Sequence, residues 1–414
     1  MLTLYNLSVF LIAKFIQLAS LFHPKARAFV TGRKGVLNSI GKALDGNSAP
    51  VVWLHSASLG EFEQGRPVIE ALKREFPGIR IFLTFFSPSG FEVRKDYPNA
   101  DYVFYLPWDT KRNAKRLIAA VKPVLAIFVK YEFWFHYSRM LKKNNVPLLS
   151  VSSIFRRDQL FFSRLGSLPR RTLKNFSHFF VQNLESIRLL HTISQYNCSL
   201  AGDTRFDRVY SVVQHNEPIA IAEAFKNHEK TMVIGSCWQE DLDVLAPFIN
   251  EGRLKFIVAP HELSETFIAE FEKSLQVRSI RYSQAEGKSL EEFTVLIIDN
   301  IGLLSRLYRY GEFAFIGGAF GKGLHNILEA ACYGIPVFFG DRNYEKFREA
   351  MDLINRGGAF AVSDYKDLKV KYELVNTPET FLLACEVTRQ YIEENLGATQ
   401  KIINYCRPVL EEKT

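Results

Sequence analysis

The stretch with the clearest capacity for chemistry is HSASLGE at residues 55–61. It follows an apolar run, its small residues allow the chain to turn sharply, and Glu61 begins the next helical pattern. A carboxylate in this position can act as a general base on an acceptor hydroxyl. An acidic residue at a helix start is also favoured by the helix macrodipole alone, so a purely structural interpretation stays open.

A second stretch, FAFIGGAFGKGLHNILE at residues 313–329, runs from a strand pattern through glycines into a helix pattern. Glycines let the backbone approach a phosphate closely, and the start of the following helix offers free N–H groups. Asn326 and Glu329 have the spacing of a capping box, and Glu329 could equally accept hydrogen bonds from a ribose diol. The stretch lacks both GxGxxG order and a Walker lysine–serine pair, which disfavours a dinucleotide site or a P-loop.

Other candidates carry weaker signals. Glu132 in VKYEFWF follows a strand-like run, Arg205 lies in AGDTRFD, and the pair Pro260–His261 ends another run. Each has an ordinary structural alternative: a charge beside aromatic residues, a solvated arginine and a structural histidine. A basic patch interleaved with phenylalanines could meet the phosphates of an amphiphilic substrate or form a solvated loop; its members are Arg156, Arg157, Arg164, Arg170, Arg171 and Lys174. No cluster of His and Asp residues indicates a divalent metal, and no cofactor is expected.

These residues follow strand-like runs that alternate with helical patterns. In the first half the runs are 50–54, 80–86, 101–106, 124–129, 147–152 and 178–182. In the second half they are 231–234, 255–258, 294–298, 313–316 and 336–339. Such alternation predicts parallel strands joined by helical crossovers, with polar residues at the strand ends where α/β sheets bind ligands.

The chain of 414 residues is too long for one ordinary domain. We predict two Rossmann-like α/β domains facing a cleft, at 45–213 and 214–378, with a plausible linker around 214–224. An N-terminal segment (1–44) precedes them, and C-terminal helices (379–414) are expected to pack back toward the first domain.

The net charge of +8 is unevenly distributed. No acidic residue precedes Asp45, whereas six basic residues do: Lys14, Lys25, Arg27, Arg33, Lys34 and Lys42. The rest of the chain is therefore nearly neutral, which argues against a nucleic-acid-binding protein. The five cysteines (Cys198, Cys237, Cys332, Cys385 and Cys406) form no CxxC pair, which excludes a zinc ribbon or disulfide framework and suits a reducing cytosol.

Residues 4–22 are mostly apolar, with Lys14 in their middle and basic residues after them. A secretory signal has its basic residues before the apolar run, so this order indicates a membrane-associated helix whose following domains stay in the cytoplasm. The helix would lie in the membrane interface or cross the bilayer weakly, and the basic residues after it would lie near anionic lipid headgroups. The alternative is a helix packed into the N-terminal domain.

The order HSASLGE, YEFW, GDTRFD, a Pro-His strand end, DNIGLL, FIGGAF and LHNILEA resembles the 3-deoxy-D-manno-octulosonic acid (Kdo) transferases of lipopolysaccharide synthesis. The likeness runs to about residue 365. It implies a glycosyltransferase B-type fold and an inverting, metal-independent transfer of Kdo from CMP-Kdo to a lipid A precursor, lipid IVA. It also implies a place on the cytoplasmic face of the cell inner membrane, among its lipids.

The resemblance also assigns roles by position. Glu61 matches the proposed general base, and Glu132 and Arg205 match residues thought to stabilise the transition state. The positions that match the CMP-binding segments are Pro260, His261, Ile301, Gly302, Leu303, Asn326, Ile327, Leu328 and Glu329.

The sequence departs from the family pattern at several of these places. The family usually has Lys at Arg205, Glu at Lys130, and an Arg between the proline and the histidine of Pro260–His261. It also has Gly-Glu-Leu at 302–304 and Gly-Gly-His-Asn at 323–326. Arg205 keeps the charge without the point ammonium. Because this Arg is missing, either Lys322 or His261 could take its place in contacting the donor phosphate.

Two other interpretations remain from the residues alone. One is another B-type glycosyltransferase that uses a UDP-sugar and a lipid-linked acceptor. A binding assay that compares cytidine with uridine nucleotides distinguishes it from a Kdo transferase. The other is a membrane-tethered nucleotide- or sugar-binding protein without catalysis, which release of CMP from CMP-Kdo would exclude. The sequence does not indicate how many Kdo units are added, the oligomeric state or the depth of the N-terminal helix.

Overall fold

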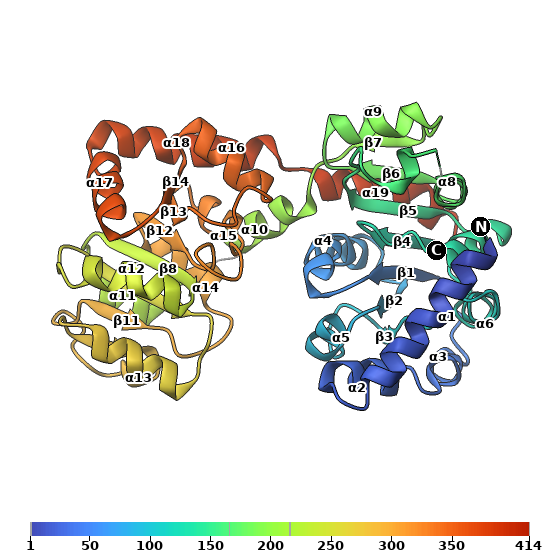
Figure 1. The fold of residues 1–414 in the computed structure, drawn as a ribbon, viewed down its shortest axis with the longest axis horizontal. Helices are drawn as coiled ribbons and strands as arrows, with labels where there is room; N and C mark the ends of the chain where they lie inside the picture. The colour runs from blue at the N-terminus through green and yellow to red at the C-terminus, as the bar shows by residue number, and fades with distance from the viewer. Residues whose placement is uncertain (1, 165, 215–216, 414) are drawn as a thin grey trace. The chain divides into compact units, whose positions relative to one another are not determined.

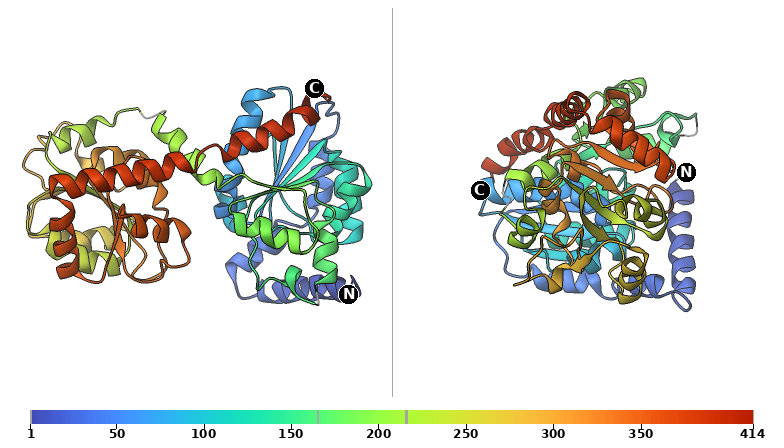
Figure 2. Two further views of the ribbon diagram at one scale, coloured as in Figure 1. Left: turned by 90° about the horizontal axis from the view of Figure 1, so that it is seen from above. Right: turned by 90° about the vertical axis from the view of Figure 1, so that its left-hand side faces the viewer.

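The computed structural model describes residues 2–164, 166–214 and 217–413, and these form two compact units. Unit 1 contains the chain up to Arg208 together with the chain from Leu396 onward, and unit 2 contains Val209–Asn395. Each unit is a parallel β-sheet with helices on both faces (Figures 1 and 2). The prediction of two Rossmann-like α/β folds is therefore confirmed.

The sheet of unit 1 has the strand order β3-β2-β1-β4-β5-β6-β7, and each pair of neighbours is parallel. The strands are β1 (Val51–Ser56), β2 (Arg80–Phe85), β3 (Tyr102–Tyr105), β4 (Leu125–Val129), β5 (Leu148–Ser153), β6 (His178–Val181) and β7 (Cys198–Leu200). The short edge strand β7 was not predicted.

Three of the helices described in unit 1 precede its first strand, others connect the strands, and the last one comes from the end of the chain. They are α1 (Leu2–Ala19), α2 (Pro24–Thr31), α3 (Val36–Ala43), α4 (Leu59–Glu75), α5 (Pro88–Arg94), α6 (Lys111–Val121), α7 (Phe135–Lys143), α8 (Ser167–Leu173), α9 (Leu184–Thr192), α10 (Thr204–Gln214, whose later part is in unit 2) and α19 (Ala398–Glu411), with a 3₁₀ turn η1 (Leu160–Phe162). Local capping fixes several starts. The Thr110 side chain, for example, accepts a hydrogen bond from the Asn113 amide at the start of α6 (3.2 Å).

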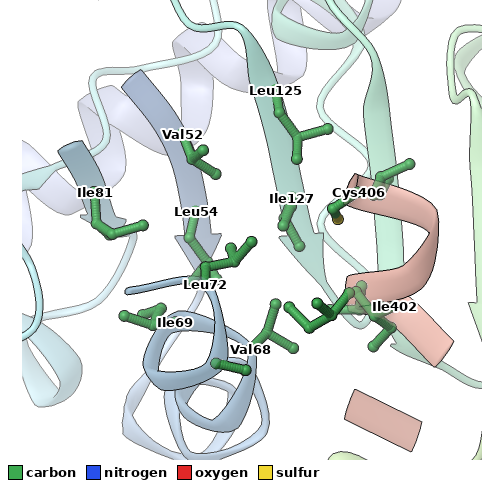
Figure 3. Packing of buried hydrophobic residues seen from close by; sticks show 14 of the residues in the cluster. Val52, Leu54, Val68, Ile69, Leu72, Ile81, Leu125, Ile127, Ile402 and Cys406 are labelled. Atoms are coloured by element: carbon green, nitrogen blue, oxygen red, sulfur yellow. The ribbon is translucent and has the colours of Figure 1, made fainter. Parts of the chain in front are cut away.

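Both faces of this sheet are buried, which is why its strands read as continuous apolar runs. On β1, Val52 and Leu54 pack with α4 and α19 on one face, whereas Val51 and Trp53 join the cluster on the opposite face. Figure 3 shows Ile402 and Cys406 of α19 beside residues of β4 and α4.

Unit 2 repeats this architecture with the parallel strand order β10-β11-β9-β8-β12-β13-β14. Its strands are β8 (Thr231–Cys237), β9 (Lys255–Pro260), β10 (Ser279–Arg281), β11 (Val295–Ile297), β12 (Phe313–Ile316), β13 (Val337–Gly340) and β14 (Ala359–Val362). Its helices are α11 (Ala220–Lys226), α12 (Gln239–Ile249), α13 (Glu265–Ser274), α14 (Leu304–Leu307), α15 (Leu328–Ala331), α16 (Arg348–Arg356), α17 (Tyr365–Val375) and α18 (Pro378–Glu394), with 3₁₀ turns η2 (Tyr282–Gln284) and η3 (Tyr308–Tyr310).

The C-terminal helices divide between the units, which corrects part of the predicted domain division. The sequence predicts that all of the C-terminal helices, residues 379–414, pack toward the first domain. Instead α18 packs on α15, α16 and α17 within unit 2, and only α19 packs on unit 1, against α4 and β4. The first crossing between units lies at 208/209 rather than 213/214. Of the predicted linker, residues 215 and 216 lie outside the described residues.

Helix α1 is attached to unit 1 through the start of α7. Asp109, only 2% exposed, accepts hydrogen bonds from the backbone amides of His136 and Tyr137 (both 3.0 Å) and from the Tyr5 hydroxyl. The His136 ring also pairs with the Asn6 side chain (2.7 Å). Asp109 therefore caps α7 from a distance and ties α1 to it.

We expect Asp109→Ala to destabilise α7 by about 3 kcal/mol, because it leaves two buried amides and a tyrosine hydroxyl without an acceptor. Tyr5→Phe should cost about 1 kcal/mol, because it removes one hydrogen bond and leaves the helix cap in place. Amide hydrogen exchange of residues 135–143 measures both effects. Unchanged protection in Asp109→Ala would show that the cap contributes nothing.

Candidate active site

In each sheet the predicted site residues follow the carboxyl ends of strands, and some of them follow the two strands where the strand order reverses. In unit 1 the reversal lies between β1 and β4, and in unit 2 between β8 and β12. Open α/β sheets bind ligands at this position, because adjacent connections run to opposite faces and leave a crevice.

Glu61 lies in the first turn of α4, directly after β1. Ser58, the N-cap residue, donates a hydrogen bond from its hydroxyl to the Glu61 carboxylate. The Lys130 ammonium lies 4.0 Å from Glu61 Oε1, and the Glu61 side chain is 24% exposed. The carboxylate is thus held at a helix start, beside a cation, and still reaches solvent.

Lys130, which follows β4, has a backbone conformation that is unusual for a residue with a side chain. Its φ is +58°, in the left-handed region. The hydroxyls of Ser150 and Ser153 donate to its carbonyl (3.4 and 3.1 Å), and its amide donates to Val151 (2.9 Å). Strain of this kind persists only where the surroundings fix it, and it is common at functional sites.

Glu132 receives two hydrogen bonds on the same oxygen. His55 Nε2 lies 2.9 Å and Trp134 Nε1 2.7 Å from Glu132 Oε2. The other ring nitrogen of the fully buried His55 lies 2.9 Å from the Thr84 hydroxyl, which accepts from Trp53 Nε1 (2.8 Å). A chain of buried polar groups therefore fixes the orientation of this carboxylate.

Arg205 is paired with Asp203, a buried neighbour in the same motif. Its Nε and Nη2 lie 2.9 and 2.8 Å from Asp203 Oδ2. Burial would raise the pKa of Asp203, but the charge and hydrogen bonds of Arg205 and the charge of Lys130 lower it below its usual value. Gln64 Nε2 donates to both Asp203 oxygens (3.1 Å each).

The structure thus places Glu61, Glu132 and Arg205 at the same edge of the unit 1 sheet. Lys130 lies beside Glu61, and its charge acts on Asp203, the partner of Arg205. It adds His55, Asp203 and Gln64, which the sequence analysis did not single out, although His55 and Asp203 lie within the motifs that it quoted. Two buried atoms here, Ser56 Oγ and Gln64 Oε1, have no hydrogen-bond partner among the described residues.

In unit 2 a buried carboxylate joins the turns that follow β8 and β12. Asp241 accepts hydrogen bonds from the amides of Trp238 and Gly318 (both 2.8 Å), and burial raises the pKa of Asp241 to about 6. Gly318 has φ +94°, and a Cβ there would lie 2.4 Å from the Gly323 carbonyl. A side chain at 318 is therefore excluded.

Three rings stack above this edge. Trp238 and His261 lie 4.1 Å apart, and His261 and His325 lie 4.7 Å apart, between ring centroids. Trp238 Nε1 lies 3.1 Å from His325 Nε2. Because an indole N–H only donates, this His325 nitrogen is the acceptor and the proton of the ring is on Nδ1. Lys322 completes the group, because its ammonium lies 3.6 Å from the centroid of the Trp238 ring.

The remaining predicted donor residues lie at the ends of neighbouring strands. Pro260 ends β9, and the His261 amide donates to Cys237 (2.9 Å). Asn326 Nδ2 donates to Glu329 Oε1 (3.1 Å), and the Leu328 amide donates to Asn326 Oδ1 (3.3 Å). The N-cap position of α15 is occupied by Ile327 rather than Asn326, because the helix begins one residue later than the pattern indicated.

The segment Ile301–Leu303 follows β11, which β9 separates from β8. Ile301 is 91% exposed and Gly302 has φ +96°. This segment belongs to the same edge as the ring stack, one strand further out than His261. Within the described ranges, no group of three or more His, Cys, Asp or Glu side chains could hold a metal ion.

Comparisons with known proteins agree with the resemblance. Residues 31–208 match the family described as 3-deoxy-D-manno-octulosonic-acid transferase. The curated 3-deoxy-D-manno-octulosonic acid transferase of Aquifex aeolicus is 28% identical over 334 residues, which cover 78% of this chain and 86% of that protein. The Haemophilus influenzae enzyme of the same name is 24% identical over 423 residues, which cover 97% of this chain and 96% of that protein.

Solved structures share the fold at low identity. A putative UDP-N-acetylglucosamine 2-epimerase from Listeria monocytogenes has a TM-score of 0.59 at 14% identity and covers 89% of this chain and 98% of its own. MurG of Acinetobacter baumannii has a TM-score of 0.55 at 10% identity, with coverages of 87% and 99%. These similarities confirm the predicted glycosyltransferase B-type fold and carry no information on substrate.

Proposed function

Because the chain belongs to the Kdo transferase family and is a glycosyltransferase, we propose that it moves Kdo from CMP-Kdo to the lipid A precursor lipid IVA. Unit 1 supplies the groups that act on the acceptor, and unit 2 supplies those that hold the donor. Glu61 is the general base.

The observation that carries this proposal is the placement of Glu61. Its carboxylate lies at the switch point of the unit 1 sheet, is partly exposed, and has the Lys130 ammonium 4.0 Å away. An ordinary helix-start acid needs neither the strained Lys130 backbone nor the network around Asp203 beside it. This supports a catalytic role over a purely structural one.

The proposed reaction has one displacement. Glu61 takes the proton of an acceptor hydroxyl while that oxygen forms a bond to the anomeric carbon of Kdo. The bond from this carbon to the CMP phosphate oxygen breaks, and the phosphate keeps the electron pair. Attack from the opposite face inverts the anomeric configuration.

Positive charge develops on the sugar ring as the leaving bond breaks, as in other glycosyl transfers. The oriented Glu132 carboxylate, which keeps two N–H partners, can oppose that charge. In unit 2 the glycine-rich turn and the group of Trp238, His261, His325 and Lys322 would hold the departing CMP.

The direct test is incubation of the purified full-length protein with tetraacyl lipid A precursor and freshly made CMP-Kdo, followed by mass spectrometry of the lipid. We expect lipid species that carry Kdo and release of CMP. Parallel incubation with UDP-sugars should leave the lipid unchanged. Intact lipid beside unreacted CMP-Kdo, or transfer from a UDP-sugar, would contradict the proposal.

The exposed face of α1 supports a location on the cytoplasmic face of the inner membrane, which is part of our proposal. The helix is long and apolar enough to cross a membrane by length and composition. However, Tyr5 and Asn6 attach it to unit 1, and Val9 is buried. Its large exposed apolar residues, with those just after it, are Leu4, Leu7, Phe10, Leu11, Ile12, Phe15, Leu18, Leu21 and Phe22. A helix held along one side in this way favours insertion into one leaflet over crossing.

We expect the double substitution Phe15→Ser and Phe22→Ser to weaken binding to phosphatidylglycerol-containing vesicles at least tenfold. Each phenylalanine that inserts into the membrane contributes about 1.5–3 kcal/mol of binding free energy through apolar burial, and the serine removes it. The two side chains are 72% and 83% exposed, so folding should be unaffected. Co-sedimentation with vesicles measures the change. The matched control is Leu382→Ser with Val370→Ser, which are 67% and 65% exposed in unit 2. Equal losses in both proteins would argue against a specific role of α1.

A further inference from the structure

Lys322 is held in one place by an aromatic ring rather than by a carboxylate. Its ammonium lies 3.6 Å from the Trp238 ring centroid, a cation–π contact. Trp238 is itself fixed, because its amide donates to Asp241 and its indole donates to His325. A lysine in the middle of a glycine-rich loop would otherwise sample many rotamers, and this contact reduces the entropy that it loses on binding a ligand.

The loop that carries Lys322 is also fixed. The amides of Gly321 and Gly323 both donate to the Gly318 carbonyl (3.2 and 2.7 Å), and Asn343 Nδ2 donates to the Gly321 carbonyl (3.2 Å). Gly323 adopts φ +123°, which only glycine tolerates without strain. Lys322 therefore lies on a closed turn just ahead of Asn326 and the start of α15.

In the group formed by Trp238, His261, His325 and Lys322, the lysine supplies the positive charge. Burial, together with the neighbouring His261, lowers the pKa of His325 to about 4. Burial also lowers the pKa of His261, and the charge of Lys322 acts in the same direction. Both imidazoles are therefore neutral near pH 7, so they can donate or accept a hydrogen bond but provide no charge to an anion.

A nucleoside monophosphate bound at this edge must have its phosphate charge met by a cation. The resemblance places an arginine between the proline and the histidine of Pro260–His261, and this chain has none there. Of the two groups that could replace it, His261 is neutral and Lys322 is charged. Lys346, a second lysine near the loop, comes within 3.3 Å of where a Cβ on Gly323 would lie, but the ring that its ammonium approaches is that of Phe347, outside the stack.

We propose that Lys322, seated on Trp238, is the cation that binds the phosphate of the donor nucleotide and replaces the missing arginine. This inference rests on the proposed function, because it takes CMP-Kdo as the donor. Lys322 contacts the phosphate oxygens, and the rings of His261 and His325 supply neutral polar contacts beside it.

The experiment compares CMP with cytidine, which differ only in the phosphate, by isothermal titration calorimetry on the full chain. In Lys322→Met we expect the CMP affinity to fall at least tenfold and the cytidine affinity to stay within twofold. Lys322→Arg should bind CMP within threefold of the unsubstituted protein, because it restores the charge. Added salt should reduce the preference for CMP over cytidine in the unsubstituted protein and much less in Lys322→Met.

The controls separate this inference from the function on which it rests. Lys273→Met, on α13, should change neither affinity, and the circular dichroism melting curve of each variant reports its folding. Equal loss of CMP and cytidine binding in a folded Lys322→Met would overturn the inference, as would loss of the CMP preference in Lys346→Met instead. If Lys322→Met binds CMP normally while the unsubstituted protein transfers Kdo, the inference fails and the function stands. If the unsubstituted protein neither binds CMP nor transfers Kdo, both fail.

Discussion

Glu61→Gln is expected to lower kcat for Kdo transfer by about 10²–10⁴-fold, the usual contribution of a general base. Glutamine keeps the size of the side chain and can still accept the hydrogen bond from Ser58, but it cannot take up a proton. The change is in unit 1, so CMP binding, which we assign to unit 2, should be unaffected. CMP release in the presence of lipid IVA measures kcat, and calorimetry measures CMP binding.

Glu63→Gln is the matched control for this prediction. Glu63 lies two residues further along α4, where its carboxylate pairs with Arg94 at 2.8 Å, away from Lys130. This variant should keep kcat within about twofold, because Glu63 has no part in the proposed proton transfer and its ion pair with Arg94 is partly exposed and therefore weak. Near-normal turnover in Glu61→Gln would remove Glu61 from the role of base, whereas equal losses in both variants would indicate damage to α4.

Glu132→Gln should lower kcat by about 10²-fold, with little change in the affinity for CMP. The amide can keep the bonds from His55 and Trp134 in part, but it loses the negative charge that opposes the charge developing on the sugar. His55→Gln should lower kcat through Glu132, because it removes the donor that orients the carboxylate. His55 is thus a positioning residue.

A double-mutant cycle tests this assignment. If His55 acts through Glu132, the double variant should lose no more than about the larger single loss, because groups that act as a unit are not additive. His178→Gln is the control for substitution of a partly buried histidine, since His178 contacts Ser199 at the far side of the sheet (2.8 Å). Losses that simply multiply, in variants that melt normally, would show that His55 contributes independently of Glu132.

The central strands were predictable because they are buried on both faces. Such strands form continuous runs of apolar residues, as in LAIFV at 125–129 and FAFI at 313–316. The strands that were missed, β7, β10 and β14, are all at sheet edges, and two of them have only three residues. An edge strand pairs on one side only, so its sequence carries a short and partly polar signal.

The tail shows a different limit of sequence patterns. Helices α18 and α19 both bury several residues, but α18 packs in unit 2, whereas α19 contributes residues such as Ile402 and Cys406 to the core of unit 1. An apolar stripe indicates that a helix is buried and does not identify its partner.

The candidate site also has features that the sequence determined and features that the tertiary structure decided. The amino-acid sequence alone determined the alternation of strands and helices, the apolar and basic character of the N-terminus, and the motifs that contain Glu61, Glu132, Arg205 and Asn326, because these depend on neighbours along the chain. Only the tertiary structure decided that His55 meets Glu132 across 77 positions, that Gln64 meets Asp203 across 139, and that Trp238 lies beneath Lys322. Parallel strands bring distant segments to one edge, and burial there makes each polar group find a partner that the local sequence does not specify.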